Sequence, residues 1–403
     1  MTQIAILGFG TVGGGVAELI DLNRKAIESR LGEGLYVKRI LDLRDFPGSP
    51  YADRITHDFE DILSDPEISI ICETMGGKEP AYTFSRKALE RGISVCTSNK
   101  ELVAAHGPEL LEIARKNGCN YLFEASVGGG IPIIRPMNTS MAPEDITSIM
   151  GILNGTTNYI MTRMEHAGIG FEEALKEAQE KGYAERNPEA DVEGHDACRK
   201  IAILSSLMCG RTVRYEDVPC EGISSVTVND FRYARAMQMA IKLLGTSKRD
   251  SEGNFFVRTA PYLVPASNPL HSVEDVFNAV YVHGNTVDDL MFYGRGAGKF
   301  PTASAVVSDV IDCARNPGHT LACKWEPEIM KLSDPAEEVF RYFVRLDKAE
   351  EKKAAAAYAG AMMLEAPEGV TGECALLTGP MTEKAFSEAS AGLQVLSFIR
   401  MLG

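Results

Sequence analysis

The sequence predicts an α/β protein that begins with a parallel β-sheet and continues into further domains. Over roughly the first 130 residues, short apolar runs alternate with helical patterns, which is typical of a parallel sheet with crossover helices. A glycine motif stands between the first apolar run and the first helical pattern. The chain has 403 residues, more than one core of ordinary size accommodates, so two or three domains are expected.

The elements of the first domain, assigned to residues 1–130, are expected in this order along the chain. Short apolar runs predict strands at residues 3–7, 36–42, 68–73, 94–97 and 121–124. Apolar residues at helical spacing predict helices at residues 12–29, 80–91 and 109–117. A second, mixed α/β domain is assigned to residues 131–325, with helices at 171–181 and from 194 to about 209.

The composition is that of a folded protein with an acidic surface. Apolar residues make up 45% of the chain and the formal net charge is -15, which argues against binding nucleic acid or an anionic membrane through a basic surface. The nine cysteines include no CxxC pair and no His/Cys cluster, so we expect reduced thiols rather than disulfides or structural zinc. Because residues 3–7 lead directly into the glycine motif and leave no room for a signal peptide, a cytoplasmic location is expected.

The glycine motif is Gly8-Phe9-Gly10-Thr11-Val12-Gly13, directly after the first strand and at the start of the first helix. The first glycine permits a tight turn, the second lets a pyrophosphate approach the backbone, and the third allows close helix packing. The helix N-terminus offers N–H groups to phosphate. We therefore predict a Rossmann dinucleotide-binding domain, since a glycine turn that binds nothing fits this context less well.

The end of the second strand is expected to lie near the adenosine ribose, and its charged residues are Arg39, Asp42 and Arg44. An acidic residue favours the free 2′-hydroxyl of NAD, whereas an arginine accommodates the 2′-phosphate of NADP. The residues leave the choice between NAD and NADP open, and a solvated strand end is as good an explanation of the arginines.

Two further loops follow strands of the first domain. Lys100 comes after the fourth strand, at the sheet edge where ligands bind, although an exposed lysine at a helix start explains it slightly better. Gly128, Gly129 and Gly130 follow the fifth strand and expose backbone oxygen atoms to a hard cation. Without further information, a turn into the next domain is the preferred interpretation.

In the second domain, polar residues gather around two helix starts. Thr156 and Thr157 follow an apolar run and are placed either to hold a carboxylate or to cap a helix. Asp196 and Lys200 are four residues apart on the next expected helix and share one face, which alone indicates a weak surface ion pair. Glu185 and Asp191 precede that helix, and this acidic loop beside a lysine suggests a site for an ammonium group with the lysine near a reacting oxygen. His195 is expected to point away from both residues and to be structural.

Six motifs, in order and at matching separations, resemble homoserine dehydrogenase; they are GFGTVG, SNKELVAAHG, FEASVGGGIPII, GILNGTTNYI, GYAERNPEADVEGHDACRK and YGRGAGKFPTASAVVSD. The resemblance spans residues 4–310. It implies NAD(P)-dependent interconversion of L-homoserine and L-aspartate 4-semialdehyde, in the pathway to threonine, methionine and isoleucine. It further implies that residues 296–315 complete the cofactor domain, that the second domain is catalytic and dimerising, and that the enzyme is a homodimer or homotetramer.

The same resemblance implies roles for individual residues. Lys200 donates the proton to the carbonyl oxygen during reduction, with Asp196 beside it; the residues expected at the substrate are Glu185, Asp191, Lys100 and Thr156. The residues expected at the cofactor are Gly8, Phe9, Gly10, Thr11, Val12, Gly13, Arg39, Thr74, Lys100 and Gly298. Backbone oxygens at Glu124, Val127, Gly129 and Ile131 match the positions that hold a monovalent cation, usually sodium. Arg186 and Asn187 depart from the family pattern, which more often has an acidic residue at the first position and an aspartate at the second.

Residues 335–403 resemble an ACT domain, a small α+β module that many family members use for feedback by threonine. Strands are expected at 339–346, 373–378 and 395–401, and helices at 349–364 and 382–393. The Pro-Gly turn usual at the ligand site is missing after Asp347, and alanines 354–357 and 359 form a plain helical run. We therefore expect a packing or dimerising module.

Two other functions compete with this interpretation. A phosphorylating semialdehyde dehydrogenase needs a thiolate nucleophile, and Cys198 is the only cysteine in the key motif. A non-catalytic amino-acid sensor would keep the fold and the ligand pocket without turnover. The presence of both Asp196 and Lys200 argues against the sensor.

Overall fold

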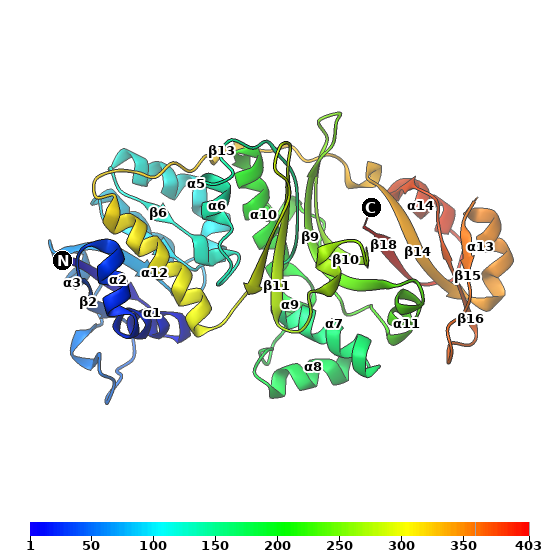
Figure 1. The fold of residues 1–403 in the computed structure, drawn as a ribbon, viewed down its shortest axis with the longest axis horizontal. Helices are drawn as coiled ribbons and strands as arrows, with labels where there is room; N and C mark the ends of the chain where they lie inside the picture. Colours follow the sequence, from blue (N-terminus) through cyan, green and yellow to red (C-terminus); the bar gives the residue numbers. More distant parts are fainter. Residues whose placement is uncertain (359, 403) are drawn as a thin grey trace. The chain divides into compact units, whose positions relative to one another are not determined.

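The computed structural model describes residues 1–358 and 360–402, and it divides into two compact units (Figure 1). Unit 1 comprises Met1–Asp145, Ala202–Tyr215 and Phe292–Met330. Unit 2 comprises Ile146–Ile201, Glu216–Met291 and residues 331–402. Helix α10 (His195–Cys209) and strand β12 (Asp288–Arg295) each contribute residues to both units.

Unit 1 contains a six-stranded parallel sheet in the order β3-β2-β1-β4-β5-β6. This order reverses direction between β1 and β4, as in doubly wound dinucleotide-binding folds, and it confirms the expected Rossmann-like sheet. The strands are β1 (Thr2–Leu7), β2 (Leu35–Leu41), β3 (Ile55–Thr56), β4 (Ile68–Glu73), β5 (Ser94–Thr97) and β6 (Tyr121–Leu122). A short parallel pair, β8 (Arg211–Thr212) and β13 (Glu326–Ile329), lies outside this sheet.

The helices of unit 1 cover this sheet and include one from late in the chain. They are α1 (Thr11–Leu22), α2 (Arg24–Leu31), α3 (Glu60–Leu63), α4 (Ala81–Glu90), α5 (Lys100–Lys116), α6 (Ile134–Asn138) and α12 (Lys299–Arg315). Helix α12 packs on α1, so closely that a Cβ on Gly15 would lie 2.9 Å from the Lys299 carbonyl oxygen. Val16 of α1 and Val306 of α12 belong to one buried apolar cluster with Ile4 and Ile6 of β1.

Three expected boundaries in this unit were wrong. The helix expected at 12–29 is two helices, because α1 ends at Leu22, Asn23 is its C-cap, and α2 begins at Arg24. The helix expected at 109–117 already begins at Lys100, where the Asn99 side chain accepts a hydrogen bond from the Leu102 N–H at 3.1 Å, and it contains Pro108. The strand expected at 121–124 ends at Leu122, since Glu124–Ser126 forms a 3-10 turn.

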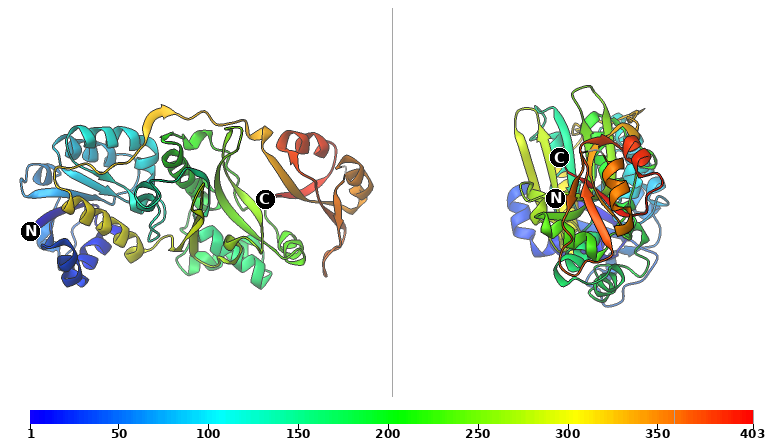
Figure 2. Two further views of the ribbon diagram at one scale, coloured as in Figure 1. Left: turned by 45° about the horizontal axis from the view of Figure 1, so that its top comes forward. Right: turned by 90° about the vertical axis from the view of Figure 1, so that its right-hand side faces the viewer.

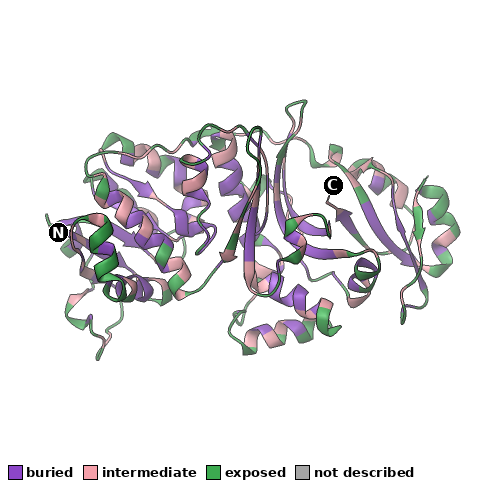
Figure 3. Cartoon of the chain, in the orientation of Figure 1, coloured by how far each residue is buried: buried purple, intermediate pink, exposed green. Residues whose placement is uncertain are grey.

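Unit 2 is built on a mixed sheet that begins with the consecutive strands β11-β7-β9-β10 and continues into the last strands of the chain. Its first strands are β7 (Ile146–Ile152), β9 (Met239–Arg249), β10 (Phe255–Pro265) and β11 (Phe277–Gly284). Its helices before residue 300 are α7 (Gly155–Ala167), α8 (Phe171–Glu180), α9 (Glu189–Val192) and α11 (Val228–Ala236), with α10 starting in this unit. Buried residues concentrate on the strands, whereas the outer faces of helices such as α8 are exposed (Figure 3).

Residues 335–402, called here the C-terminal subdomain, follow a β-α-β-β-α-β pattern. The elements are β14 (Val339–Asp347), α13 (Glu351–Ala357), β15 (Met362–Leu364), β16 (Glu373–Leu377), α14 (Glu383–Ser390) and β18 (Val395–Met401), with a short β17 (Met381–Thr382) beside β14. The strands lie in the order β18-β14-β16-β15, with antiparallel neighbours. The helix expected at 349–364 was wrong in its second half: it ends at Ala357, Gly360 has φ +78°, and β15 follows; residue 359 lies outside the described residues.

The two faces of this subdomain sheet have different partners. On one face, Tyr342 stacks on Phe386 of α14 with ring centroids 4.0 Å apart, and Ala354 of α13 joins the same buried cluster. The helices α13 and α14 lie on one side of these strands in the views of Figures 1 and 2. On the other face, Phe343 and Ile399 belong to a cluster that includes residues of α7 and α11.

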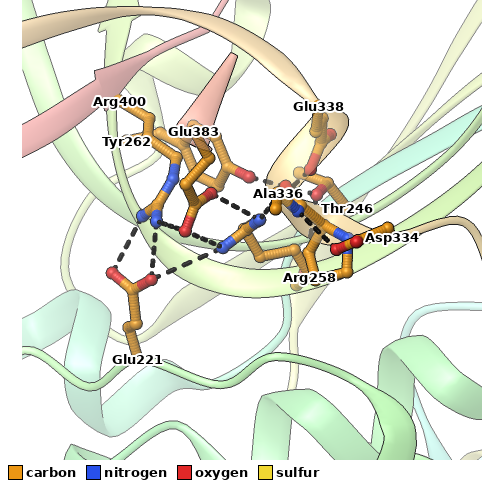
Figure 4. A network of polar contacts seen from close by, with 10 residues as sticks. Glu221, Thr246, Arg258, Tyr262, Asp334, Ala336, Glu338, Glu383 and Arg400 are labelled. Atoms are coloured by element: carbon orange, nitrogen blue, oxygen red, sulfur yellow. Dashed lines mark hydrogen bonds and ion pairs between the residues drawn. The ribbon is translucent and has the colours of Figure 1, made fainter. Parts of the chain in front are cut away.

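A network of charged residues lies where β18 pairs with β10, a parallel contact that involves only two residue pairs (Figure 4). Arg258 of β10 and Arg400 of β18 are each 2% exposed. Arg258 pairs with Glu383 at 2.7 Å and Glu338 at 3.3 Å, and Arg400 pairs with Glu221 at 2.8 Å and Glu383 at 3.0 Å. The carboxylates thereby compensate two arginines that have almost no contact with water.

Candidate active site

The glycine motif of unit 1 forms a tight turn with open space above it. Gly8 has φ +86°, and a Cβ on Gly13 would lie 2.0 Å from the Gly8 carbonyl oxygen, so both positions require glycine. Thr74 Oγ1 donates to the Leu7 and Gly8 carbonyl oxygens at 3.0 and 2.8 Å and thereby fixes the turn to the end of β4. A Cβ on Gly10 would meet no atom within 4 Å, so this position has room for the phosphates of a dinucleotide.

The charged residues at the end of β2 are held against the glycine motif. Asp42 Oδ2 accepts the Phe9 N–H at 2.7 Å, and its carboxylate is paired with the Arg44 guanidinium at 2.9 Å. The hydrogen bond from Arg44 lowers the pKa of Asp42 to about 2, so this carboxylate is charged at physiological pH. Arg39 lies inside β2 and, in the described part of the chain, makes no hydrogen bond to the glycine motif.

The carboxyl ends of β4 and β5 are joined by a buried acid that the sequence argument did not single out. Glu73 is fully buried and accepts hydrogen bonds from Thr97 Oγ1 at 2.5 Å and from the Met75 N–H at 2.8 Å. Thr97 Oγ1 in turn accepts the Asn99 N–H at 2.9 Å, and Asn99 caps the helix that begins with Lys100. Glu73 therefore fixes both the loop that carries Thr74 and the helix start that carries Lys100.

Replacing Glu73 by glutamine is expected to remove a pH dependence of stability. Burial raises the pKa of Glu73 to about 7. Between pH 4.5 and 7 the folded chain retains a proton that the unfolded chain releases, so stability falls by about 3 kcal/mol as pH rises. Glu73→Gln keeps the shape without the charge, and it should gain stability relative to the wild type at pH 8 but not at pH 5. Urea unfolding at both pH values measures this; an equal difference at both would contradict it.

The loop after β6 is organised by the Glu124 side chain. Its carboxylate accepts the N–H groups of Ile133, Ile134 and Arg135 at 2.6 to 2.9 Å. Gly129 has φ +57°, and a Cβ there would lie 2.2 Å from the Gly296 carbonyl oxygen. Gly298, with φ +121°, is the N-cap residue of α12. Among the described residues, no group of three or more His, Cys, Asp or Glu side chains is arranged to hold a metal ion.

In unit 2, a buried cluster surrounds Lys200 at the start of α10. Lys200 Nζ donates to Asp196 Oδ2 and to the Leu153 carbonyl oxygen, both at 2.7 Å. Asn154 Nδ2 donates to Asp196 Oδ2 at 2.8 Å and to Asp191 Oδ1 at 2.7 Å. Lys200 and Asp196 are 8% and 4% exposed, so their pair is not the surface ion pair that the spacing alone suggested.

Asn154 is the residue that sequence reasoning missed in this cluster. It is the N-cap of α7, where its Oδ1 accepts the Thr157 N–H at 2.9 Å, and its Nδ2 joins the two aspartates. Its position directly before a helix was the only available signal, and capping alone explained that signal. One amide thus sets both the start of α7 and the orientation of the acids beside Lys200.

The remaining predicted residues of unit 2 are Thr156, in the first turn of α7, and Glu185, in the loop before α9. Thr156 Oγ1 donates to the Tyr183 carbonyl oxygen at 2.7 Å, which ties α7 to this loop. Gln179 Nε2 donates to the Glu185 carbonyl oxygen at 3.1 Å, and the Glu185 side chain is exposed to solvent. Glu185 makes no described hydrogen bond to Lys200, so the structure does not join it directly to the buried cluster.

His195 and Cys198 are close to Lys200 in the sequence, but neither makes a described hydrogen bond to it. His195 is exposed, and its Nδ1 lies 3.9 Å from Cys220 Sγ rather than beside Lys200, consistent with its predicted orientation. Cys198 is 3% exposed and its thiol lies 3.9 Å from the Val218 carbonyl oxygen. A thiol buried in this way is not presented as a nucleophile for a semialdehyde.

None of the described helices has the apolar length to cross a membrane.

Comparisons with known proteins agree over both units. A family model for homoserine dehydrogenase matches residues 132–311, and a model for the NAD-binding domain of homoserine dehydrogenase matches residues 8–124. The homoserine dehydrogenase of Synechocystis sp. is 47% identical over 318 residues, which cover 77% of this chain and 72% of that protein. That of Bacillus subtilis is 41% identical over 78% of this chain and 73% of its own.

Solved structures extend the similarity to the whole chain. The crystal structure of a homoserine dehydrogenase from Thiobacillus denitrificans has a TM-score of 0.90 at 32% identity and covers 100% of this chain and 98% of that one. A hyperthermophilic archaeal homoserine dehydrogenase mutant in complex with NADPH has a TM-score of 0.66 at 29% identity and covers 77% of this chain and 97% of its own. Since the sequence relatives, the family models and the glycine and Lys200 sites agree, this chain belongs to the homoserine dehydrogenase family.

Proposed function

We propose that Lys200 and Asp196 handle the proton in the reaction of this enzyme, which interconverts L-homoserine and L-aspartate 4-semialdehyde with NAD(P) on the route to threonine, methionine and isoleucine. The observation that carries the proposal is the buried contact of Lys200 Nζ with Asp196 and the Leu153 carbonyl oxygen. An ammonium has three N–H donors, and these contacts use two of them. The third serves the substrate oxygen.

In the oxidative direction, the substrate carbon that bears the hydroxyl loses a hydride and the hydroxyl loses its proton, so that a carbonyl forms. The bound nicotinamide supplies the hydride acceptor. Lys200 stabilises the oxygen as its proton departs to water, and in reduction it donates a proton to the carbonyl oxygen. Asp196, itself held by Asn154, keeps the ammonium in place rather than exchanging protons with the substrate.

Glu185, in the loop before α9, and Asp191, in α9, provide the negative charge that a zwitterionic substrate requires. Glu185 and Asp191 bind the ammonium group of homoserine, and Asn154 orients Asp191 by its hydrogen bond at 2.7 Å. Thr156 and Lys100 are assigned to the substrate as well. Thr156 is hydrogen-bonded to the Tyr183 carbonyl oxygen, two residues before Glu185. An ammonium beside a carboxylate is stabilised most where water is excluded, and Asn154, which holds Asp191, is buried.

The dinucleotide is assigned to Gly8, Phe9, Gly10, Thr11, Val12, Gly13, Thr74, Lys100 and Gly298, with Arg39 as a further contact of the adenosine end. The tight turn and the open space at Gly10 support this assignment. The charged Asp42 at the end of β2 favours NAD over NADP, because a carboxylate there repels a 2′-phosphate.

Asp42→Asn is therefore expected to shift the enzyme toward NADP. The amide still accepts the Phe9 N–H, but it no longer repels the phosphate, and Arg44 loses its ionic partner. Like charges about 4 Å apart in water repel by about 1 kcal/mol, which predicts a change of about fivefold in the ratio of kcat/KM values for the two cofactors. Steady-state kinetics with both cofactors measure the ratio; a shift toward NAD would contradict the assignment.

A monovalent cation, most simply sodium, is assigned to the backbone oxygens of Glu124, Val127, Gly129 and Ile131. The Glu124 carboxylate is already committed to three N–H groups, so a cation here depends on carbonyl oxygens, which are hard ligands. No described N–H donates to the carbonyl oxygens of Val127, Gly129 or Ile131. Replacing sodium by choline in the assay is expected to lower turnover. Unchanged turnover would contradict the assignment of a cation to these backbone oxygens.

The C-terminal subdomain is assigned as an ACT-like packing or dimerising module of a cytoplasmic homodimer or homotetramer. Its β-α-β-β-α-β order and its antiparallel four-stranded arrangement support the assignment. Size-exclusion chromatography with light scattering, with and without threonine, tests both the assembly and the effector. A monomer would overturn the dimerising role.

The activity itself is tested by the absorbance of reduced nicotinamide. Purified protein is mixed with L-homoserine and NAD+ or NADP+, in parallel cuvettes that contain sodium or potassium. A homoserine-dependent rise is expected, and the four cuvettes rank the cofactors and the cations. No rise with a folded protein would contradict the proposed roles of Lys200 and Asp196.

A further inference from the structure

Glu73 is a buried acid of unit 1 to which the proposed chemistry gives no role. It is the last residue of β4, and each of its carboxylate oxygens accepts a hydrogen bond, one from the Met75 N–H at 2.8 Å and one from the Thr97 hydroxyl at 2.5 Å. We propose that Glu73 is a positioning residue for the reaction, which sets the place of Lys100 through hydrogen bonds with Thr97 and Asn99. This role rests on the proposed contact of Lys100 with the substrate.

The hydrogen bonds of Glu73 form a closed ring, called here the Glu73 network. Thr97 Oγ1 donates to Glu73 and accepts the Asn99 N–H at 2.9 Å. Asn99 Nδ2 donates to the Gly77 carbonyl oxygen at 2.7 Å, and Gly77 leads back along the chain to Glu73. Because Asn99 is the N-cap of α5 and Lys100 is its first residue, the network fixes this helix start to the end of β4.

The loop inside this ring also contacts the glycine motif. A Cβ on Gly8 would lie 3.2 Å from the Met75 nitrogen and from the Thr74 carbonyl oxygen. Thr74 Oγ1 donates to the Gly8 carbonyl oxygen at 2.8 Å. Glu73 thus joins the turn assigned to the dinucleotide to the helix start assigned to the substrate.

The directions of these hydrogen bonds require an ionised carboxylate. The single hydrogen of the Thr97 hydroxyl is given to Glu73, while its oxygen accepts the Asn99 N–H. An ionised carboxylate only accepts, so it matches both Met75 and Thr97. A protonated Glu73 carries a hydrogen of its own and a glutamine carries an NH2 group, so either one places a donor where another donor already points. The neutral forms therefore weaken the network.

The charge of Glu73 changes near neutral pH. Burial raises the pKa of Glu73 to about 7. The groups that face it are Thr97, Asn99, the Met75 N–H and, from β6, Tyr121. Burial and the charge of Glu73 hold the pKa of Tyr121 well above its usual range, so this phenol stays neutral. Among these groups, Glu73 is the one whose charge responds to pH between 6 and 8.

Steady-state kinetics of the wild type and Glu73→Gln at pH 6 and pH 8 test this role through KM for homoserine. At pH 8 the variant should raise KM about tenfold, the factor that corresponds to one hydrogen bond of ordinary strength, with a smaller change in kcat. At pH 6 the wild-type acid is itself mostly neutral, so the two KM values should agree within about twofold. Because Glu73→Gln is expected to be the more stable protein at pH 8, unfolding cannot produce this pattern. Equal KM ratios at both pH values would overturn the proposal.

Two variants of Thr97 test the same network without a change of charge. Thr97→Val removes the hydroxyl and should raise KM at pH 8 as Glu73→Gln does. Thr97→Ser keeps the hydroxyl and should hold KM within about twofold of the wild type. If the valine and serine variants had the same KM, the hydroxyl of Thr97 would not connect Glu73 to Lys100, and the proposal would fail.

Glu338 and Lys100 provide the controls. Burial also raises the pKa of Glu338, but this acid lies in unit 2 beside Arg258, so Glu338→Gln should give the same KM ratio to the wild type at both pH values. Lys100→Met should raise KM for homoserine at both pH values. An unchanged KM in Lys100→Met would contradict the proposed role of Lys100. A raised KM there, together with a ratio for Glu73→Gln that does not depend on pH, would overturn the role of Glu73 alone.

Discussion

Lys200→Met is expected to lower kcat by about 10²- to 10⁴-fold, the contribution typical of a general acid or base. Methionine fills a similar volume in this buried position but offers no N–H to the substrate oxygen. The loss should fall on kcat more than on KM, because the interaction is strongest in the transition state. Cofactor affinity, which depends on residues of unit 1 in the proposed assignment, should stay near that of the wild type.

A matched variant separates catalysis from folding. Lys242 is also a buried lysine of unit 2, 1% exposed, and its Nζ donates to the Val273 carbonyl oxygen at 2.7 Å. Lys242→Met removes a buried ammonium without touching Asp196, so its kcat should stay within about threefold of the wild type, a difference of less than 1 kcal/mol. Homoserine oxidation, cofactor titration and thermal unfolding are measured for both variants. Near-normal turnover of Lys200→Met would remove Lys200 from the mechanism.

The parts of the site that could be predicted from the sequence are those whose residues lie close together along the chain. The glycine motif has a fixed spacing next to a strand, and Asp196 and Lys200 are one helical turn apart, so the peptide geometry alone brings them together. Glu73 and Asn154 have no such signal. Their partners Thr97 and Asp196 are 24 and 42 residues away, and only the folded chain brings them into contact.

The same contrast holds for the fold: elements set by short sequence patterns were predicted, whereas pairings between residues far apart in the chain were not. Five of the six strands in the unit 1 sheet were predicted because buried parallel strands are short apolar runs, whereas β3 was missed, since Ile55–Thr56 is only two residues long. Strand β15 was missed because its three residues follow an alanine-rich helix, and its place is fixed by pairing with β16. The pairing of β18 with β10, which joins the C-terminal subdomain to the rest of unit 2, involves residues some 140 positions apart and has no sequence signal.

Arg258→Met is expected to destabilise unit 2 by about 3–5 kcal/mol, as is typical when one partner of a buried ion pair is removed. The arginine is 2% exposed and holds Glu338 and Glu383. Without it, Glu338 has no ion pair among the described residues, and Glu383 keeps its ion pair with Arg400. β10 and β18 share only two paired residues, so at this contact the ion pairs of Arg258 and Arg400 act beside a short backbone pairing.

The destabilisation caused by Arg258→Met is expected to depend on pH. Burial raises the pKa of Glu338 even with Arg258 present, so in the variant Glu338 takes up a proton more readily as pH falls. Protonation removes the uncompensated charge, and the difference in unfolding free energy from the wild type should therefore be smaller at pH 5 than at pH 8. Urea unfolding at both pH values measures the two differences. The exposed Arg86, paired with Glu90 on α4, provides the control, since Arg86→Met should change stability by less than about 0.5 kcal/mol. If Arg258→Met were equally mild, the carboxylates would be compensated without Arg258, and the subdomain contact would rest on apolar packing instead.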